Sequence, residues 1–170
     1  SYIHDRGIIH RDITPGNIMI GPDDQVKLTD FGVVKELGAD MTVVGEVIGT
    51  AAYIAPEQIR GDALDARADL YSLGCVLYLM LTGRRLFSAQ TIHGLMEKQL
   101  HQIPKPPRQI DPLVPEHLNN ICVRLLSKEP DNRYASASHL LHVLGDTSSN
   151  IDMGEDWLDY SVGRPLVRAR

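Results

Sequence analysis

The most informative part of the chain is His10-Arg11-Asp12-Ile13-Thr14-Pro15-Gly16-Asn17, and Asp30-Phe31-Gly32 begins thirteen residues after Asn17. The two stretches hold two carboxylates, Asp12 and Asp30, and the amide of Asn17. Oxygen ligands of this kind suit magnesium, which keeps water and phosphate oxygens in its remaining positions. The spacing therefore favours metal-assisted phosphoryl transfer.

A short hairpin is predicted between these two stretches. Strand-forming residues fill 17–20 and 26–29, and Gly21-Pro22-Asp23-Asp24 between them has the composition of a turn. Pairing of the two strands would bring Asn17 and Asp30 to the same end of the structure. That closeness is what a shared metal site needs.

Together with Ala55-Pro56-Glu57, these motifs resemble the catalytic half of the eukaryotic-type protein kinase family, in content and in order. The resemblance spans about Ile3 to Leu144. It implies a mainly α fold, the protein-kinase-like carboxy-terminal lobe, which is a helical bundle with a short β-hairpin carrying the catalytic and metal loops. We expect this lobe over residues 1–145 and a polar tail or linker over 146–170.

The composition is consistent with one lobe. A chain of 170 residues with 43% hydrophobic content has room for one globular core but not for a whole two-lobed kinase. A net charge of −5 gives no basic surface, so nucleic acid is not expected as a partner. Cys75 and Cys122 lie in apolar helical patterns, which favours buried thiols in a reducing compartment.

No apolar stretch reaches the length of about 20 residues that crosses a bilayer. We expect no membrane contact by this segment and a cytoplasmic location, with any membrane anchor of the parent protein outside it.

Most of the remaining elements are expected to be helices. The apolar residues of 66–82 recur at three- and four-residue steps up to Gly83, which predicts a deeply buried helix that includes Met80. Ser88 is the predicted cap of a helix through Gln102. Further helices are expected at 116–127 after Pro115, and from Ser136 or Ser138 to near Gly145. Residues 33–54 are expected to form a long surface loop.

The resemblance implies a role for each motif residue at the reaction centre. Asp12 would accept the proton of the substrate hydroxyl, while Asn17 and Asp30 would hold magnesium, or manganese, together with ATP. Thr50, in the segment Gly49 to Glu57 that would receive the protein substrate, is typical of serine/threonine kinases. Its hydroxyl is expected to contact Asp12.

Two further residues have expected regulatory roles. An arginine beside the catalytic aspartate commonly pairs with a phosphorylated loop residue, so Arg11 and Thr42 are the candidate regulatory pair. The alternative for Thr42, an ordinary solvated threonine, stays open.

Structural roles are expected for the others: His10 packing beneath Phe31 without proton transfer, Gly32 in the metal loop, Asp69 accepting backbone N–H groups of the catalytic loop, and Glu57 with Arg133 in a buried salt bridge.

One residue departs from the family pattern. Serine/threonine kinases usually carry lysine two residues after the catalytic aspartate, and here that position is Thr14. A hydroxyl supplies no positive charge to the transferring phosphate, so low activity and pseudokinase behaviour are both open.

The sequence shows no Gly-rich loop, strand lysine or partner glutamate, which the amino-terminal lobe of a kinase carries. We expect that lobe to precede Ser1, and we expect the isolated chain, as a fragment, to be inactive. The preferred hypothesis is the catalytic lobe of an ATP-dependent serine/threonine protein kinase, of the bacterial type by the look of residues 45–50. The alternative is a pseudokinase or protein-docking module. A small-molecule kinase is disfavoured by Ala55-Pro56-Glu57.

Overall fold

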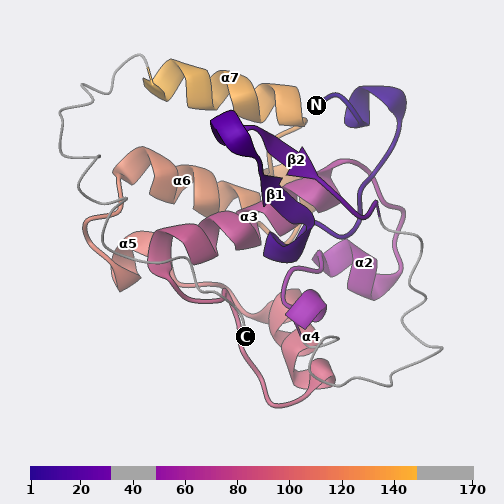
Figure 1. Cartoon of the computed structure of the whole chain (residues 1–170). Helices are drawn as coiled ribbons and strands as arrows, with labels where there is room; N and C mark the ends of the chain where they lie inside the picture. Colours follow the sequence, from indigo (N-terminus) through magenta and orange to yellow (C-terminus); the bar gives the residue numbers. More distant parts are fainter. Residues whose placement is uncertain (32–48, 149–170) are drawn as a thin grey trace.

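The computed structural model describes residues 1–31 and 49–148. Its elements, with η for short 3-10 helices, are η1 (His4–Arg6), η2 (Pro15–Asn17), β1 (Ile18–Ile20), η3 (Pro22–Asp24), β2 (Val26–Leu28), α2 (Pro56–Arg60), α3 (Arg67–Thr82), α4 (Ile92–His101), α5 (Pro107–Ile110), α6 (Glu116–Leu125), η4 (Pro130–Asn132) and α7 (Ala137–Ser148). Helices surround α3, as Figure 1 shows. The mainly helical fold with one short hairpin is confirmed.

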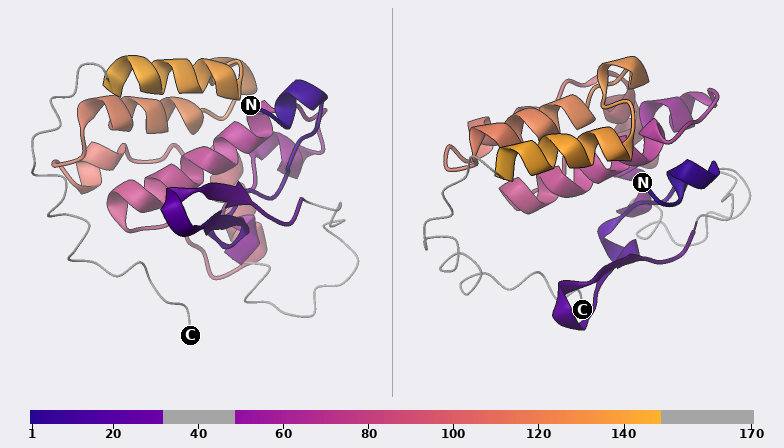
Figure 2. Two further views of the ribbon diagram at one scale, coloured as in Figure 1. Left: turned by 45° about the horizontal axis from the view of Figure 1, so that its top comes forward. Right: turned by 90° about the horizontal axis from the view of Figure 1, so that it is seen from above.

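The hairpin has the predicted position. Strands β1 and β2 are antiparallel, with Ile18 opposite Leu28 and Ile20 opposite Val26. The N–H of Gly21 donates to the carbonyl of Gln25 at 2.8 Å and closes the turn. The hairpin stands out from the helices, while α6 and α7 lie side by side (Figure 2). The turn residues Pro22, Asp24 and Gln25 are exposed, whereas Ile18 at the other end of the hairpin packs against buried apolar residues.

Helix α3 forms the centre of the fold because it contributes to both groups of buried apolar residues. Tyr71 and Cys75 lie in the first group with Ala51 and Phe87. Leu70 lies in the second with residues of α6 and α7. Gly83, at φ 66°, ends the helix. The predicted helix and its deep burial are confirmed for most of its length.

Met80 is the exception on α3. Its side chain is 72% exposed, so the prediction that it is buried was wrong. Periodicity placed it on the buried stripe, but the last turn of α3 presents this side to solvent.

Close packing of α3 on α6 depends on a glycine. A Cβ atom on Gly74 would lie 2.8 Å from Cβ of Leu125 and 3.2 Å from Cδ2 of Leu126. Because Gly74 has no side chain, the two helices can approach each other closely at this point. The thiol of Cys122 on α6 also lies 3.7 Å from the carbonyl oxygen of Gly74.

Both cysteines are free and buried, as expected. Burial raises the pKa of Cys122 to about 12 and raises that of Cys75 further. Both thiols therefore remain protonated and serve as apolar packing groups.

Several element boundaries differ from the sequence predictions. Helix α4 begins after Thr91, whose Oγ1 accepts from the N–H of Gly94, so Ser88 is not its cap. Helix α7 continues past Gly145 to Ser148. The short helices α2 and α5 were not predicted.

The stretch 33–54 was expected to be surface loop throughout. Residues 32–48 lie outside the described residues, but Ala51, Ala52 and Tyr53 are buried. The expectation was wrong for these three, because Gln99 of α4 and Ser72 of α3 donate hydrogen bonds to the carbonyls of Ala52 and Tyr53 and hold this stretch against the two helices.

Candidate active site

Asn17 is held against Asp12 by two hydrogen bonds. Its Nδ2 donates to the carbonyl oxygen of Asp12 at 2.8 Å and to the Oδ2 atom of the Asp12 carboxylate at 3.0 Å. The turn η2 sets this geometry, since the N–H of Asn17 donates to the carbonyl of Thr14 at 3.1 Å. With its NH₂ group occupied, the Oδ1 atom of Asn17 is left as an acceptor.

Asp30 lies beside this pair because of the hairpin. The N–H of Thr29 donates to the carbonyl of Asn17 at 3.0 Å, and Asp30 is the next residue. Its backbone is in the left-handed region, with φ 53°, which costs a non-glycine residue about 1–2 kcal/mol. Such a conformation persists where the surroundings fix it, and it is common at active sites.

The three side chains suit a hard divalent cation in their chemistry. The acceptor atoms of Asp12, Asn17 and Asp30 are carboxylate and amide oxygens, the ligand type that magnesium prefers. In the described parts of the chain no group of three His, Cys, Asp or Glu residues could hold a metal ion. The amide oxygen of Asn17 and oxygens from a bound phosphate would therefore have to complete the coordination.

His10 connects the loop of residues 10–17, the expected catalytic loop, to the residue before Asp30. It is fully buried, and its Nε2 donates to the carbonyl of Thr29 at 3.0 Å. Its Nδ1 lies 3.4 Å from the N–H of Asp12. The rings of His10 and Phe31 lie 4.8 Å apart. The imidazole thus orders the backbone on both sides of the site.

Asp69 fixes the catalytic loop to α3. Its buried carboxylate accepts from the N–H groups of His10 and Arg11, each at 2.8 Å. It also accepts from Nε2 of His4 at 2.8 Å. Arg11 has a left-handed backbone, with φ 67°, and the carboxylate holds it there. No sequence signal singled out His4.

The segment that follows residue 48 is attached to the same loop through Gln58. The Oε1 atom of Gln58 accepts from the N–H of Ala55 at 3.1 Å, and Nε2 donates to the carbonyl of Arg11 at 3.1 Å. One side chain therefore sets the spacing between the catalytic loop and the segment before α2.

The expected contact between Thr50 and Asp12 is a different matter. The hydrogen bonds of residues 1–31 and 49–148 include none between these two side chains, so the expected contact stays a prediction. The carboxylate of Asp12 is engaged with Asn17 instead, and the carbonyl of Thr50 accepts from Tyr53 in a local turn at 3.1 Å.

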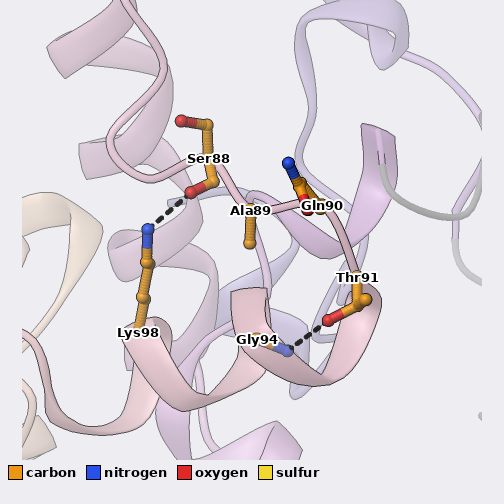
Figure 3. A pocket seen from close by; sticks show the side chains of 6 residues that line it. All are labelled: Ser88, Ala89, Gln90, Thr91, Gly94 and Lys98. Atoms are coloured by element: carbon orange, nitrogen blue, oxygen red, sulfur yellow. Dashed lines mark hydrogen bonds between the residues drawn. The ribbon is translucent and has the colours of Figure 1, made fainter.

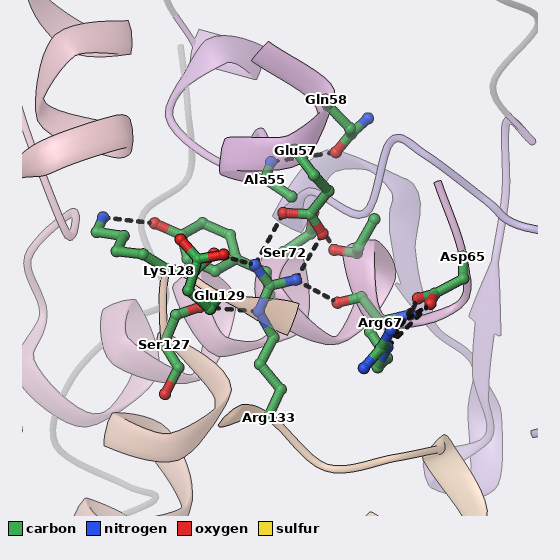
Figure 4. A network of polar contacts seen from close by, with 12 residues as sticks. Ala55, Glu57, Gln58, Asp65, Arg67, Ser72, Ser127, Lys128, Glu129 and Arg133 are labelled. Carbon is green, nitrogen blue, oxygen red and sulfur yellow. Dashed lines mark hydrogen bonds and ion pairs between the residues drawn. The ribbon is translucent and has the colours of Figure 1, made fainter. Parts of the chain in front are cut away.

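Glu57 and Arg133 form a buried bidentate ion pair, with N–O distances of 2.6 and 2.8 Å (Figure 4). The guanidinium also donates to the carbonyls of Ser127, Arg67 and Lys128 at 2.8–2.9 Å. These contacts engage all five of its N–H groups. The pair joins α2 to the start of α3 and to the chain after α6.

Three of the predicted residues cannot be assigned a side-chain partner. Arg11 has an exposed side chain that forms no ion pair with any residue the structure describes. Gly32 and Thr42 lie outside the described residues.

Some polar residues of this region were missed by the sequence reasoning. Gln99 is fully buried, and the Oγ of Ser72 donates to the carbonyl of Tyr53 at 2.7 Å. A signal was present for Gln99, because it follows Ile92 and Leu95 at helical spacing on the apolar face of α4. A polar residue at such a position needs buried partners.

A depression of about 620 Å³ lies at the start of α4, and none of Asp12, Asn17 and Asp30 lines it (Figure 3). Its polar groups serve local structure, since Lys98 donates to the carbonyl of Ser88 and Thr91 caps the helix. We assign it no role.

Within the described ranges, no helix combines the length and apolar character needed to cross a membrane.

Replacing Glu57 with glutamine is expected to reduce the free energy of unfolding by about 3–5 kcal/mol, because it leaves the buried guanidinium of Arg133 without its counter-charge. Chemical denaturation monitored by circular dichroism measures this. Glu116→Gln is the matched control, since Glu116 pairs with Arg108 at 3.4 Å on the exposed surface and should contribute at most about 1 kcal/mol. Equal losses in the two variants would contradict the assignment.

Comparison with known proteins agrees with this geometry. The model of the protein kinase domain family matches residues 1–144. The chain is 46% identical over 140 residues to the probable serine/threonine-protein kinase PknB of Bifidobacterium longum, covering 81% of this chain and 20% of that protein. It is 42% identical over 143 residues to the serine/threonine-protein kinase PknB of Mycolicibacterium smegmatis, covering 82% and 23%.

A probable serine/threonine-protein kinase of Clostridium acetobutylicum is 38% identical over 151 residues, covering 88% of this chain and 23% of that protein. The chain thus spans about a fifth to a quarter of the length of these curated relatives, all of which are bacterial. Because the family model covers residues 1–144 of the 170, the chain belongs to the protein kinase domain family.

Proposed function

We propose that this chain is the catalytic lobe of a serine/threonine protein kinase, which in the complete protein transfers the γ-phosphate of ATP to a serine or threonine hydroxyl of a protein substrate. The observation that carries the proposal is the double hydrogen bond from Asn17 to Asp12, beside a hairpin end that presents Asp30. The family and the names of the relatives support it.

Each side chain has a separate task in this proposal. Asp12 orients the substrate hydroxyl and accepts its proton, since its second carboxylate oxygen has no bond to Asn17. Asn17 and Asp30 hold magnesium, or manganese, which when bound with ATP neutralises charge on the phosphate oxygens. Because ATP is the donor, the proposal places the lobe in the cytoplasm.

A second lobe is part of the proposal. Met19, Ile20 and Val26 of the hairpin are 56–65% exposed, and Phe31 is 48% exposed. Apolar side chains gathered on one short hairpin favour a covering partner. We infer that the ATP-binding amino-terminal lobe of the complete kinase covers them.

Asp12→Asn should lower phosphate transfer by about 10²–10⁴-fold, because an amide cannot accept the hydroxyl proton while it keeps an oxygen for the bond from Asn17. The measurement uses the complete protein, γ-labelled ATP and dephosphorylated casein, with autophosphorylation followed in parallel.

Asp24→Asn is the matched control for that experiment. Asp24 also has a left-handed backbone, with φ 56°, but lies in the turn at the far end of the hairpin. It should retain wild-type activity. Equal phosphate incorporation by wild type and Asp12→Asn would show that Asp12 is not the base.

A pseudokinase or protein-docking module is the second candidate, and Thr14 is the observation that favours it. Thr14 is half-buried with an extended backbone, φ −133° and ψ 162°, directly before the turn that positions Asn17. Its hydroxyl supplies no charge for the transferring phosphate.

Thr14→Lys should therefore raise turnover of the complete protein by about tenfold or more, since an ammonium group would stabilise the charge that develops in transfer. Thr14→Met, of similar length but uncharged, is the control. If both variants match wild type, another cation already performs this task. If wild type and Thr14→Lys are both inactive while Asp12→Asn changes nothing, the docking module becomes the better reading.

Regulation by phosphorylation is proposed for Arg11 and Thr42. The exposed guanidinium of Arg11 suits a bidentate bond to a phosphate group. Mass spectrometry of an active preparation should find phosphate on Thr42, and Arg11→Met should reduce the activation that this phosphate produces. Full activity without phosphate on Thr42 would remove the proposal.

A further inference from the structure

Three polar side chains form a continuous line of hydrogen bonds from the protein surface to the backbone of the segment before α2. Nζ of Lys128 donates to Oη of Tyr71 at 3.1 Å. Oη of Tyr71 donates to Oε1 of Gln99 at 2.6 Å. Nε2 of Gln99 donates to the carbonyl of Ala52 at 2.7 Å. We call these three residues the Lys128–Tyr71–Gln99 relay.

All donors in the relay are aligned in one direction, toward Ala52. Burial raises the pKa of Tyr71 well above its ordinary value, so its hydroxyl keeps the proton that it donates to Gln99. Tyr71 and Gln99 are fully buried. In such surroundings successive hydrogen bonds strengthen one another, and an unpaired member is costly.

The outer end of the relay is anchored independently. Nζ of Lys128 also donates to the carbonyl of Gln99 at 2.6 Å, at the carboxy-terminal end of α4. It lies 4.8 Å from the centre of the Phe87 ring. The position of Lys128 is therefore fixed by the carbonyl of Gln99 and by the ring of Phe87, independently of its contact with Tyr71.

The inner end of the relay holds one of two consecutive carbonyl groups. The carbonyl of Ala52 accepts from Gln99, and that of Tyr53 accepts from Oγ of Ser72 at 2.7 Å. Both carbonyls belong to the stretch between Thr50 and Glu57, and neither is part of a described helix or strand. Side chains of α3 and α4 thus take the place of regular backbone pairing there.

We propose that Tyr71, Gln99 and Lys128 are positioning residues that fix the substrate-receiving segment around Ala52, and that they act on binding of the protein substrate rather than on ATP or on the chemical step. The inference rests on the proposed kinase function. None of the three contacts Asp12, Asn17 or Asp30 through a hydrogen bond in the described parts of the chain.

Tyr71 also connects the relay to the ion pair at the other end of the same segment. The guanidinium of Arg133, which binds Glu57, lies 4.9 Å from the centre of the Tyr71 ring. One tyrosine therefore contacts the groups that hold Ala52 and Glu57. Loss of its hydroxyl alone interrupts the relay between Lys128 and Gln99 and leaves this ring contact in place.

Tyr71→Phe in the complete protein is the test, with Tyr78→Phe as the matched control. Tyr78 lies on the same helix and in the same buried apolar group, and its hydroxyl makes no hydrogen bond with any described residue. Tyr71→Phe should raise KM for dephosphorylated casein by about three- to tenfold, the range expected for one lost hydrogen bond. KM for ATP and kcat should stay within about twofold of wild type.

Hydrogen exchange read by mass spectrometry supplies a second readout that needs no activity. Amides of residues 50–57 should exchange faster in Tyr71→Phe, and those of α6 and α7 should not change. If Tyr71→Phe fails to fold, Lys128→Met, altered at the half-exposed end of the relay, should show the same pattern with smaller changes.

The outcomes separate the two proposals. A wild-type protein that phosphorylates neither casein nor itself would overturn the proposed function, while faster exchange over 50–57 in Tyr71→Phe would still support the relay. Values of KM and exchange that match those of Tyr78→Phe would overturn the relay, and so would an equal effect on KM for ATP.

Discussion

The buried guanidinium of Arg133 is the interaction on which the arrangement of this lobe depends. A charge removed from water is unfavourable by several kcal/mol unless every donor finds an acceptor, and here all five N–H groups do. The acceptors come from α2, the first turn of α3 and the chain after α6, so those segments can satisfy the cation only in one relative placement. The ion pair with Glu57 is thereby a constraint on geometry more than a source of stability.

Side chains of helix α3 then position the other segments of the site. Because successive residues of a helix are turned by about 100°, residues near its start point in different directions. Asp69 reaches the catalytic loop, Tyr71 reaches α4, and Ser72 reaches the carbonyl of Tyr53. A single turn of one buried helix therefore sets the relative position of the catalytic loop and the segment that would receive substrate.

The sequence predicted the parts that depend on local chemistry. The hairpin follows from strand formers around a proline turn, and α3 follows from its periodicity. Predictions failed where tertiary contacts decide. Met80 fits the helical stripe but faces solvent. Thr91 rather than Ser88 caps α4, although serine is the stronger capping residue. The role of Gln99 depends on a partner 47 residues away, which no local pattern reveals.

In these contacts, backbone groups attach the two segments to the helices, and the side chains proposed to act in phosphate transfer are not used for attachment. The loop that holds Asp12 is attached through the N–H groups of His10 and Arg11, and the segment proposed to receive substrate is attached through its carbonyls. Neither attachment uses a side chain proposed to act in phosphate transfer. Asp12 and Asn17 bond to each other, and the Asp30 carboxylate is exposed. This arrangement tolerates threonine in place of the usual lysine at position 14 without loss of the fold, because the residue contributes its backbone carbonyl to the turn whatever its side chain. A protein of this family can therefore keep its fold whether or not it keeps its turnover, because turnover depends on charged groups that the fold does not need.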